Sequence, residues 1–410
     1  IFVTEKPKFA RINLYGELPT DASPTRLPTT LNFDFLIGKR KVFSAKCELS
    51  IQGNASATSE KKGYTFDILN LDGKSLKIKF GDLIASDSLH LKAYQTDRTH
   101  TRDLGMGRAW REIINSNGYP VSEVNNKPYS ITSSEANELF ISDAKYRPEG
   151  FPVEIYLNDA FHGLYTLRLK KTRENYALNN KNLNHIFLDN IDYNATLIAG
   201  FNPAKWELKS PKMTGYVEGG TIPTVSVNDS VQRFFNWMKD FKNNTGTARA
   251  DYGNYIVLEN WIDYLIFIEV FDHRDSNGNN INLITWNNTH WVWCPYDMDN
   301  SIGLNPFNNA WTIDSSRNGF CSADFFVSFR PYFLPQIKLR YAELKANKIL
   351  TVQNLGKYFD DIEASIPRDV ANADKNKWVN KFTNEYPTIQ QIKLFLKNRL
   401  EWLDTQWLNP

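Results

Sequence analysis

The spacing of apolar residues changes near the middle of the chain, and this change limits the possible fold more than any other feature. Up to about residue 170, apolar and polar residues alternate in short runs, which is typical of half-buried β-strands. The predicted strands are Phe9–Tyr15, Thr30–Ile37, Ala45–Ile51, Tyr64–Leu69, Leu76–Phe80, Ser88–Ala93, Pro152–Leu157 and Gly163–Leu169. Asn158 and Asp159 tolerate left-handed backbone geometry, so we expect a tight hairpin between the last two strands. A single helix, Gly107–Asn115, is predicted in this half.

Helical spacing dominates the second half. The predicted helices are Val231–Phe241 with a cap at Asn228–Ser230, Tyr255–Phe271, Pro331–Ala346, Val352–Ser365 and Ile389–Trp407. One hairpin, with strands Ile281–Trp286 and His290–Tyr296, interrupts them. These patterns predict an α+β fold with a β-rich N-terminal lobe and a mainly helical C-terminal lobe. We divide the chain into an N-terminal strand and connector (1–28), a β-rich lobe (29–225) and a helical lobe (226–410).

Charge and cysteine content narrow the class of protein. The chain of 410 residues has 48 Lys and Arg against 46 Asp and Glu, a formal net charge of +2, which argues against a dedicated nucleic-acid binder. No apolar run reaches the roughly 18 residues of a membrane-spanning helix, so we expect no membrane span. The three cysteines are odd in number and lack C-x-x-C spacing, which excludes a zinc ribbon and a disulfide scaffold. The sequence begins with Ile1 and shows no signal peptide, so it assigns no compartment.

The segment from Asp272 to Asp299 carries the candidate chemistry. The apolar helix before it would place Asp275 in a polar loop, and Asn280 follows five residues later. The hairpin then returns the chain, so we expect Asp297 to emerge beside Asn280. Carboxylate and amide oxygens are suitable ligands for a hard divalent cation such as Mg²⁺. The sequence therefore predicts a divalent-metal site at one end of the hairpin.

The spacing of this segment matches the catalytic loop of protein kinases. His273-Arg274-Asp275 with Asn280 fits H-R-D-x-x-x-x-N, and an aspartate follows after a hairpin. In that loop the first Asp orients the acceptor hydroxyl, and the Asn and the later Asp hold Mg²⁺. Phosphoryl transfer depends mainly on positioning and on neutralising charge, so this set of groups suffices. Two features differ from a typical kinase: Asp297-Met298-Asp299 stands in place of Asp-Phe-Gly, and no glycine-rich loop is found.

Five blocks in order resemble the spore coat protein H (CotH) family of atypical, kinase-like proteins. The blocks are Cys47–Ser56 with Lys61–Tyr64, Leu89–Tyr94 with Arg102-Asp103, Val153–Leu167, Asp272–Asn280 and Tyr296–Gly303. The third block, VEIYLNDAFHGLYTL, is similar to the family signature V-x-V-Y-L-N-G-x-Y-x-G-L-Y. The last, YDMDNSIG, is similar to W/Y-D-x-D-x-T-F-G. Together they cover most of the chain.

The resemblance implies an atypical protein-kinase-like fold and a secreted or surface-associated phosphotransferase. Such a protein would bind ATP and Mg²⁺ between its two lobes and phosphorylate Ser or Thr of coat or surface proteins. Asp275 matches the catalytic aspartate, Asn280 the metal-binding asparagine, and Asp297 and Asp299 the paired metal aspartates. We favour Asp297 as the direct ligand because it leaves the strand first. Arg168 and Lys170 alternate onto one face and are candidates for the phosphates, with Arg102 as a third.

Three departures from the family pattern support a second hypothesis. Gln52 stands where the family usually has Arg, Asp103 replaces an Asn, and Arg168-Leu169-Lys170 stands where the family usually places an acidic residue. The alternative is therefore a catalytically degenerate module that binds an assembly partner in a coat, a surface assembly or a virion appendage. A weaker third reading is a lectin-like protein that uses exposed tryptophans such as Trp311.

Several candidate residues also have plainly structural interpretations. Asp297 and Asp299 could bind a structural Ca²⁺, although an EF-hand is excluded because Ile302 occupies the position of the required glycine. His273 could hold the loop through hydrogen bonds, and Arg102 could form a surface ion pair. The aromatic residues of the hairpin fit a buried core better than a sugar-binding platform; they are Trp286, Trp291, Trp293 and Tyr296. No H-E-x-x-H or G-x-S-x-G occurs, so zinc and serine hydrolases lack support.

Overall fold

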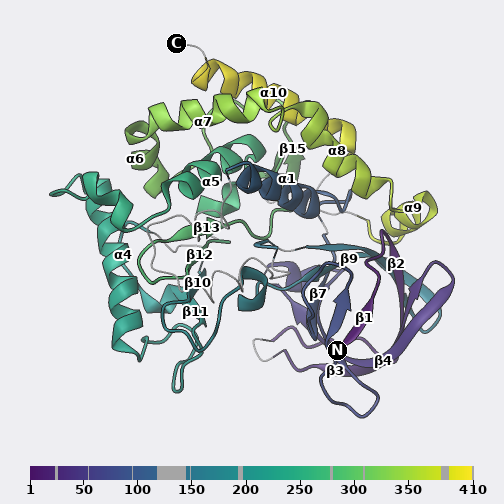
Figure 1. Cartoon of the computed structure of the whole chain (residues 1–410). Coiled ribbons are helices and arrows are strands. Elements are labelled where there is room, and N and C mark those ends of the chain that lie inside the picture. Colours follow the sequence, from purple (N-terminus) through teal and green to yellow (C-terminus); the bar gives the residue numbers. More distant parts are fainter. Residues whose placement is uncertain are drawn as a thin grey trace.

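Seven strands of the N-terminal half close into a barrel in the order β2-β3-β4-β5-β7-β9-β8 (Figure 1). The computed structural model describes residues 1–23, 26–53, 55–94, 96–117, 145–147, 149–192, 197–277, 280–307, 310–379 and 387–408. The barrel strands are β2 (Ala10–Tyr15), β3 (Thr29–Ile37), β4 (Arg40–Gln52), β5 (Gly63–Leu69), β7 (Ser88–Lys92), β8 (Gly150–Leu157) and β9 (Ala160–Leu169). β2 runs parallel to β8, and the other neighbours are antiparallel. A separate two-stranded sheet joins β1 (Phe2–Thr4) to β6 (Ile78–Phe80).

Alternation along the strands divides the barrel into an apolar interior and a polar exterior. On β7, Leu89 and Leu91 belong to the barrel core, and they lie opposite Leu169 and Leu167 of β9. The intervening positions therefore share the outer face: His90 lies opposite Arg168, and Lys92 lies opposite Thr166. The predicted β8–β9 hairpin is confirmed, and its two turn residues have positive φ angles of 49° at Asn158 and 66° at Asp159.

Helix α1 (Arg102–Ser116) and the chain after β9 form a second part, in which helices pack around a four-stranded sheet in the order β11-β10-β12-β13. Its strands are β10 (Ile186–Asn190), β11 (Trp206–Ser210), β12 (Asn282–Thr285) and β13 (Val292–Cys294), and a further hairpin pairs β14 (Leu304–Phe307) with β15 (Ala310–Ile313). The helices are α1 (Arg102–Ser116), α4 (Val225–Asn243), α5 (Leu258–Phe271), α6 (Phe325–Tyr332), α7 (Leu334–Ala346), α8 (Val352–Glu363), α9 (Arg368–Lys377) and α10 (Ile389–Trp407). The chain therefore has the mixed helix and sheet content of an α+β protein. The three-part division of the chain stays a prediction.

Helix α5 lies at the centre of this second part. Nearly all of its side chains are buried, because α1, α7, α10 and β13 surround it. Tyr264 stacks on Trp293 with ring centroids 4.7 Å apart, and Trp261 meets the same ring edge-on at 5.2 Å. The aromatic residues of the hairpin, from Trp286 to Tyr296, are likewise buried. Their interpretation as core is confirmed, whereas the side chain of Trp311 lies outside the described residues.

Three sequence-based assignments of helices differ from the structure. Helix α4 begins at Val225 after Thr224, so Asn228–Ser230 lie within it rather than at its cap. The predicted helix Pro331–Ala346 is two helices, α6 and α7, with the break at Phe333. Helix α1 begins at Arg102, five residues before the predicted start. Sequence signals for helix ends are local, and tertiary packing can move a helix boundary by several residues.

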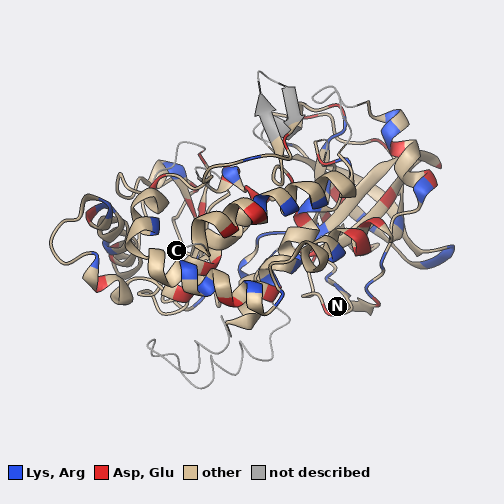
Figure 2. Cartoon of the chain, turned by 90° about the horizontal axis from the view of Figure 1, so that it is seen from above, with Lys and Arg blue, Asp and Glu red and all other residues tan. Residues whose placement is uncertain are grey.

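Charged residues are spread over both halves. Lys and Arg alternate with Asp and Glu along the helices and the barrel in the view from above (Figure 2). Within the described part of the chain, no helix is both long and apolar enough to cross a bilayer.

A buried carboxylate fixes α9 against the barrel. Asp374 accepts hydrogen bonds from Arg98 at 3.1 Å and from the backbone N–H of Leu164 on β9 at 2.8 Å, and Lys61 Nζ lies 2.8 Å from it. Burial alone would raise the pKa of Asp374, but the charge of Lys61 outweighs burial and holds it below its usual value. Gly163 permits the close approach, because a Cβ there would lie 3.0 Å from Asp374 Oδ1. Asp374 therefore forms a buried charged link between α9 and the barrel.

Replacement of Asp374 by Ala should strongly destabilise the protein. The change leaves Lys61 and Arg98 buried without their counter-charge, which typically costs about 3–5 kcal/mol. Urea unfolding measures this loss. The exposed Asp361 on α8 serves as a control, since Asp361→Ala should change the free energy of unfolding by no more than about 0.5 kcal/mol. A loss below about 1 kcal/mol for Asp374→Ala would show that the cluster does not hold α9.

Candidate active site

The candidate site forms where the outer face of β7 and β9 meets the segment after β13. Asp297 Oδ1 accepts a hydrogen bond from Lys92 Nζ at 2.7 Å, and both Nη atoms of Arg168 lie 3.4 Å from it. Burial alone would raise the pKa of Asp297, but the charges of Lys92 and Arg168 outweigh it and lower the pKa well below its usual value. The Asp297 side chain keeps 28% of its surface exposed. It is therefore held between two cations and still open on one side.

Arg168 joins three elements at this point. It is fully buried and forms an ion pair with Asp103 in the first turn of α1. It also donates to the hydroxyl of Tyr296 at 3.0 Å. Asp103 in turn accepts from the hydroxyl of Tyr94 and from the backbone N–H of Met298 at 3.1 Å. This network links α1, β9 and the segment that carries Asp297.

The structure brings the three predicted aspartates together. Asp275 lies on a short 3-10 turn, Arg274–Asn277, directly after α5 and is half-buried. Its pKa is raised to about 6 by burial and by the negative charge of Asp297, while a hydrogen bond from Asn300 opposes the shift. The pKa of Asp299 is raised to about 8 by burial and by Asp297, with Lys92 opposing the shift. Asp297 therefore interacts electrostatically with both Asp275 and Asp299, and burial is the main reason that their pKa values are raised.

Asn280 stands at the start of the hairpin that leads to Asp297. It is buried and has a left-handed φ of 54°. The backbone N–H of the next residue, Ile281, donates to Asn190 Oδ1 of β10 at 2.7 Å, which fixes the start of the hairpin. His273 is buried and its Nδ1 lies 3.0 Å from Ser301 Oγ. Burial lowers the pKa of His273 to about 4, so His273 is neutral and holds the loop, as one interpretation predicted.

The other predicted phosphate ligands have different surroundings. Arg102 forms an ion pair, as one interpretation predicted, but it is fully buried, so the predicted surface position is wrong. It donates to Asp97 at 2.7 Å and to the carbonyl of Ser301 at 3.0 Å, which ties α1 to the segment after β13. Lys170 donates to Ser88 Oγ at 2.9 Å. The phosphate contacts assigned to Arg102, Lys170 and Arg168 stay predictions.

Lys92 was not predicted from the sequence. It reaches Asp297 from the barrel because it shares the outer face of β7 with His90, opposite Thr166 and Arg168 of β9. The register of β7 against β9 is the signal that could have found it. A lysine that alternates with core leucines, on the same face as a candidate arginine, points its charge to the same place.

A divalent cation at this site stays a prediction. Among the described residues, no group of three or more His, Cys, Asp and Glu is placed to hold a metal ion by itself. Mg²⁺ does not need such a group, because it usually takes one or two carboxylates together with water and substrate phosphate. The side chains of Asp297, Asp299 and Asn280 contain oxygen atoms of the kind that such a cation prefers.

A model of the family described as CotH kinase protein matches residues 49–403. The chain belongs to this family. No curated protein matches the chain. The CotH match contains every candidate residue from Lys92 to Asp299. It begins within β4, so barrel strands β2 and β3 precede it.

The ion pair between Asp103 and Arg168 should show energetic coupling. Asp103→Asn and Arg168→Gln each leave a buried charge without its partner, and the double variant removes both charges. In urea unfolding of the four proteins we expect a coupling energy of about 0.5–3 kcal/mol. Asp103→Asn combined with Arg40→Gln on an exposed hairpin should be additive. Additivity in both pairs would contradict the network described above.

Proposed function

We propose that the protein transfers the γ-phosphate of ATP to a Ser or Thr hydroxyl of a coat or surface protein, in a kinase-like manner. The observation that carries this proposal is the ion pair between Lys92 of the barrel and Asp297 after the hairpin. It sets a cation from one lobe against a metal-type carboxylate from the other, beside Asp275. That is the combination of charges that phosphoryl transfer requires.

Each residue has a distinct role in this proposal. Lys92 supplies a fixed positive charge for the phosphates, and Arg168 holds Asp297 and Asp103 in place. The carboxylate of Asp275 accepts a hydrogen bond from the acceptor hydroxyl and aligns its oxygen with the γ-phosphorus. Asn280, Asp297 and Asp299 would hold Mg²⁺, which when bound neutralises charge on the phosphates. The γ-phosphoryl group moves to the hydroxyl oxygen, ADP leaves and the hydroxyl proton is released.

Two departures from the family pattern offset each other. Asp103 and Arg168, one acidic and one basic, form a buried ion pair with each other. An unpaired buried charge at either position would destabilise the protein. The substitution at each position is therefore explained by the substitution at the other. Their pairing supports a site that keeps an ordered arrangement rather than one that has decayed.

The alternative is a catalytically degenerate module of a coat, surface assembly or virion appendage. The observation in its favour is that protein cations already surround Asp297, since Lys92 and Arg168 both lie within 3.4 Å of it. If these ion pairs persist in the presence of nucleotide, Asp297 is not available to a metal ion. Calorimetry with Mg-ATP distinguishes the kinase hypothesis from the module hypothesis. Saturable, magnesium-dependent binding supports a kinase, and the absence of such binding supports a degenerate module.

Asp275→Asn should abolish most of the transfer while leaving nucleotide binding intact. The amide keeps the shape of the side chain but is a poor acceptor for the hydroxyl proton, so we expect transfer to fall by about 10²-fold or more. The measurement is incorporation of label from γ-labelled ATP into a degenerate Ser/Thr peptide library and into the protein itself. Asp361→Asn on exposed α8 is the matched control. Equal, non-zero transfer by Asp275→Asn and wild type would remove Asp275 from the mechanism.

Lys92→Met should weaken binding of Mg-ATP about tenfold to a hundredfold, as expected for loss of a hydrogen bond between charged groups. Binding of adenosine, which lacks phosphates, should change far less. Lys39→Met, at an exposed position of the β3–β4 hairpin, controls for loss of a positive charge. The role of Lys92 fails if its variant loses affinity for adenosine and Mg-ATP to the same degree.

A further inference from the structure

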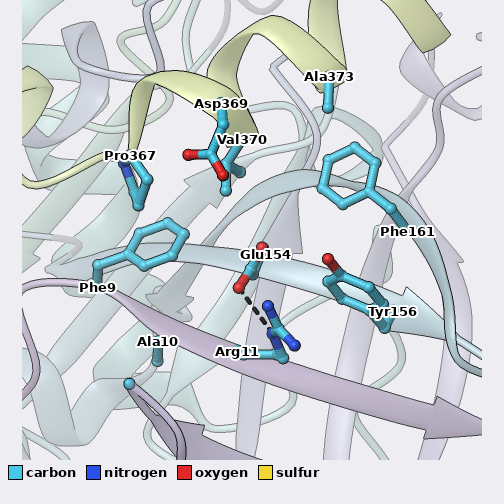
Figure 3. Close-up of a pocket in the computed structure, with 11 residues that line it drawn as sticks. Phe9, Ala10, Arg11, Glu154, Tyr156, Phe161, Pro367, Asp369, Val370 and Ala373 are labelled. Atoms are coloured by element: carbon cyan, nitrogen blue, oxygen red, sulfur yellow. Dashed lines mark hydrogen bonds and ion pairs between the residues drawn. The ribbon is translucent and has the colours of Figure 1, made fainter.

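A pocket of about 390 Å³ lies between the barrel and the start of α9, apart from the candidate active site (Figure 3). Its barrel wall includes Phe9 just before β2, Arg11 of β2, and Tyr156 and Phe161 of the β8–β9 hairpin. Its other wall includes Pro367 and Asp369. We propose that this pocket binds an arginine side chain of a partner protein.

The walls of the pocket are fixed before any ligand arrives. Val370 of α9 and Ile366 just before it pack with Leu164 of β9, and Phe9 and Phe161 pack against this small cluster. The buried Asp374, one turn further along α9, anchors the same helix to β9. A partner would therefore meet a formed pocket and would not have to order it, which favours binding.

The charges in the pocket leave one carboxylate available. Arg11 donates to Glu154 at 2.7 Å, so these two charges offset each other. Asp369 is exposed on the opposite wall, and no hydrogen bond or ion pair joins it to another of the described residues. Figure 3 shows the Asp369 carboxylate over the space between Phe9 and Glu154. The pocket thus carries a formal charge of −1 and favours a cation.

The aromatic side chains select a flat cation with an apolar stem. Three rings line the space, from Phe9, Tyr156 and Phe161, together with Pro367. The pocket already contains one contact of the required kind, since the guanidinium carbon of Arg11 lies 4.2 Å from the centroid of the Tyr156 ring. Guanidinium stacks on rings and binds carboxylates through two parallel hydrogen bonds, whereas the ammonium of lysine does neither as well.

The size of the pocket fits one side chain with its adjoining backbone. Its volume is near the lower end of the roughly 300–1,000 Å³ range of small-molecule sites. Phe9 and Arg11 precede residue 49, where the family match begins, whereas α9 lies within the match. The pocket thus combines a segment outside the matched range with one inside it. Binding here does not depend on phosphate transfer, and it can be measured whether or not the chain is a kinase.

Fluorescence polarisation with short labelled peptides tests the proposal. Three otherwise uncharged peptides carry at one position arginine, lysine or the neutral isostere citrulline. We expect saturable binding of the arginine peptide, with weaker binding of the lysine peptide and the weakest for citrulline. Asp369→Asn should weaken binding of the arginine peptide about tenfold. Asp361→Asn on α8 should leave it unchanged.

A second variant tests whether binding requires the open volume of the pocket rather than its charge. Ala373 lines the pocket from α9, and Ala373→Phe should fill it and remove binding of the arginine peptide. If Ala373→Phe folds poorly, Asp369→Asn still tests the proposal, because Asp369 is exposed and its substitution should not disturb folding. The proposal is overturned if no peptide binds saturably, if the three peptides bind equally, or if Asp369→Asn binds as wild type does.

Discussion

The ion pair between Lys92 and Asp297 is the contact on which the account of the site depends. It joins two residues that are 205 positions apart in the sequence, one on the barrel and one after the hairpin of the helical half. Arg168 reinforces it from the neighbouring strand and extends it to α1 through Asp103. Because these charges are largely buried, each depends on its partner, and removing one would leave the others uncompensated. The geometry of the site therefore depends on how the barrel and the helical part of the chain are positioned against each other.

Asp374 provides a second point of attachment between the halves. It brings α9 onto β9 through Lys61, Arg98 and a backbone N–H, and Gly163 leaves room for that contact. Both attachments rely on carboxylates that pair with cations of the barrel, but they lie in different regions. The Asp297 network forms the candidate active site, whereas the Asp374 cluster supports the wall of the arginine pocket. Polar contacts of this kind fix relative position more tightly than apolar packing alone, because their geometry is directional.

The sequence correctly predicted elements whose structure is determined by residues that are close together in the chain. The β8–β9 hairpin followed from Asn158 and Asp159, and α10 from its helical spacing. The return of Asp297 toward Asp275 followed from the hairpin between them. The CotH family match agrees with the blocks seen in the sequence. The kinase activity, the nucleotide and the metal stay predictions.

The parts that the sequence did not predict depend on contacts between distant residues. Lys92 was missed because its partner is far along the chain, and Arg102 was placed at the surface because arginines usually lie there. Helix α9 was missed because only Val370 and Asp374 of its side chains are buried, so it lacks an apolar stripe. Its attachment comes instead from a buried carboxylate. Strands β10 and β11 are short and are held by strand pairing, since β10 pairs with the distant β12 and β11 pairs with β10.

A crystal structure with Mg²⁺ and a non-hydrolysable ATP analogue tests the central claim most directly. The account predicts the triphosphate beside Lys92, with Mg²⁺ bound by Asn280 and Asp297 and the γ-phosphate facing Asp275. An analogue bound elsewhere, or Asp297 still paired with Lys92 and without metal at a saturating concentration of the analogue, would contradict it.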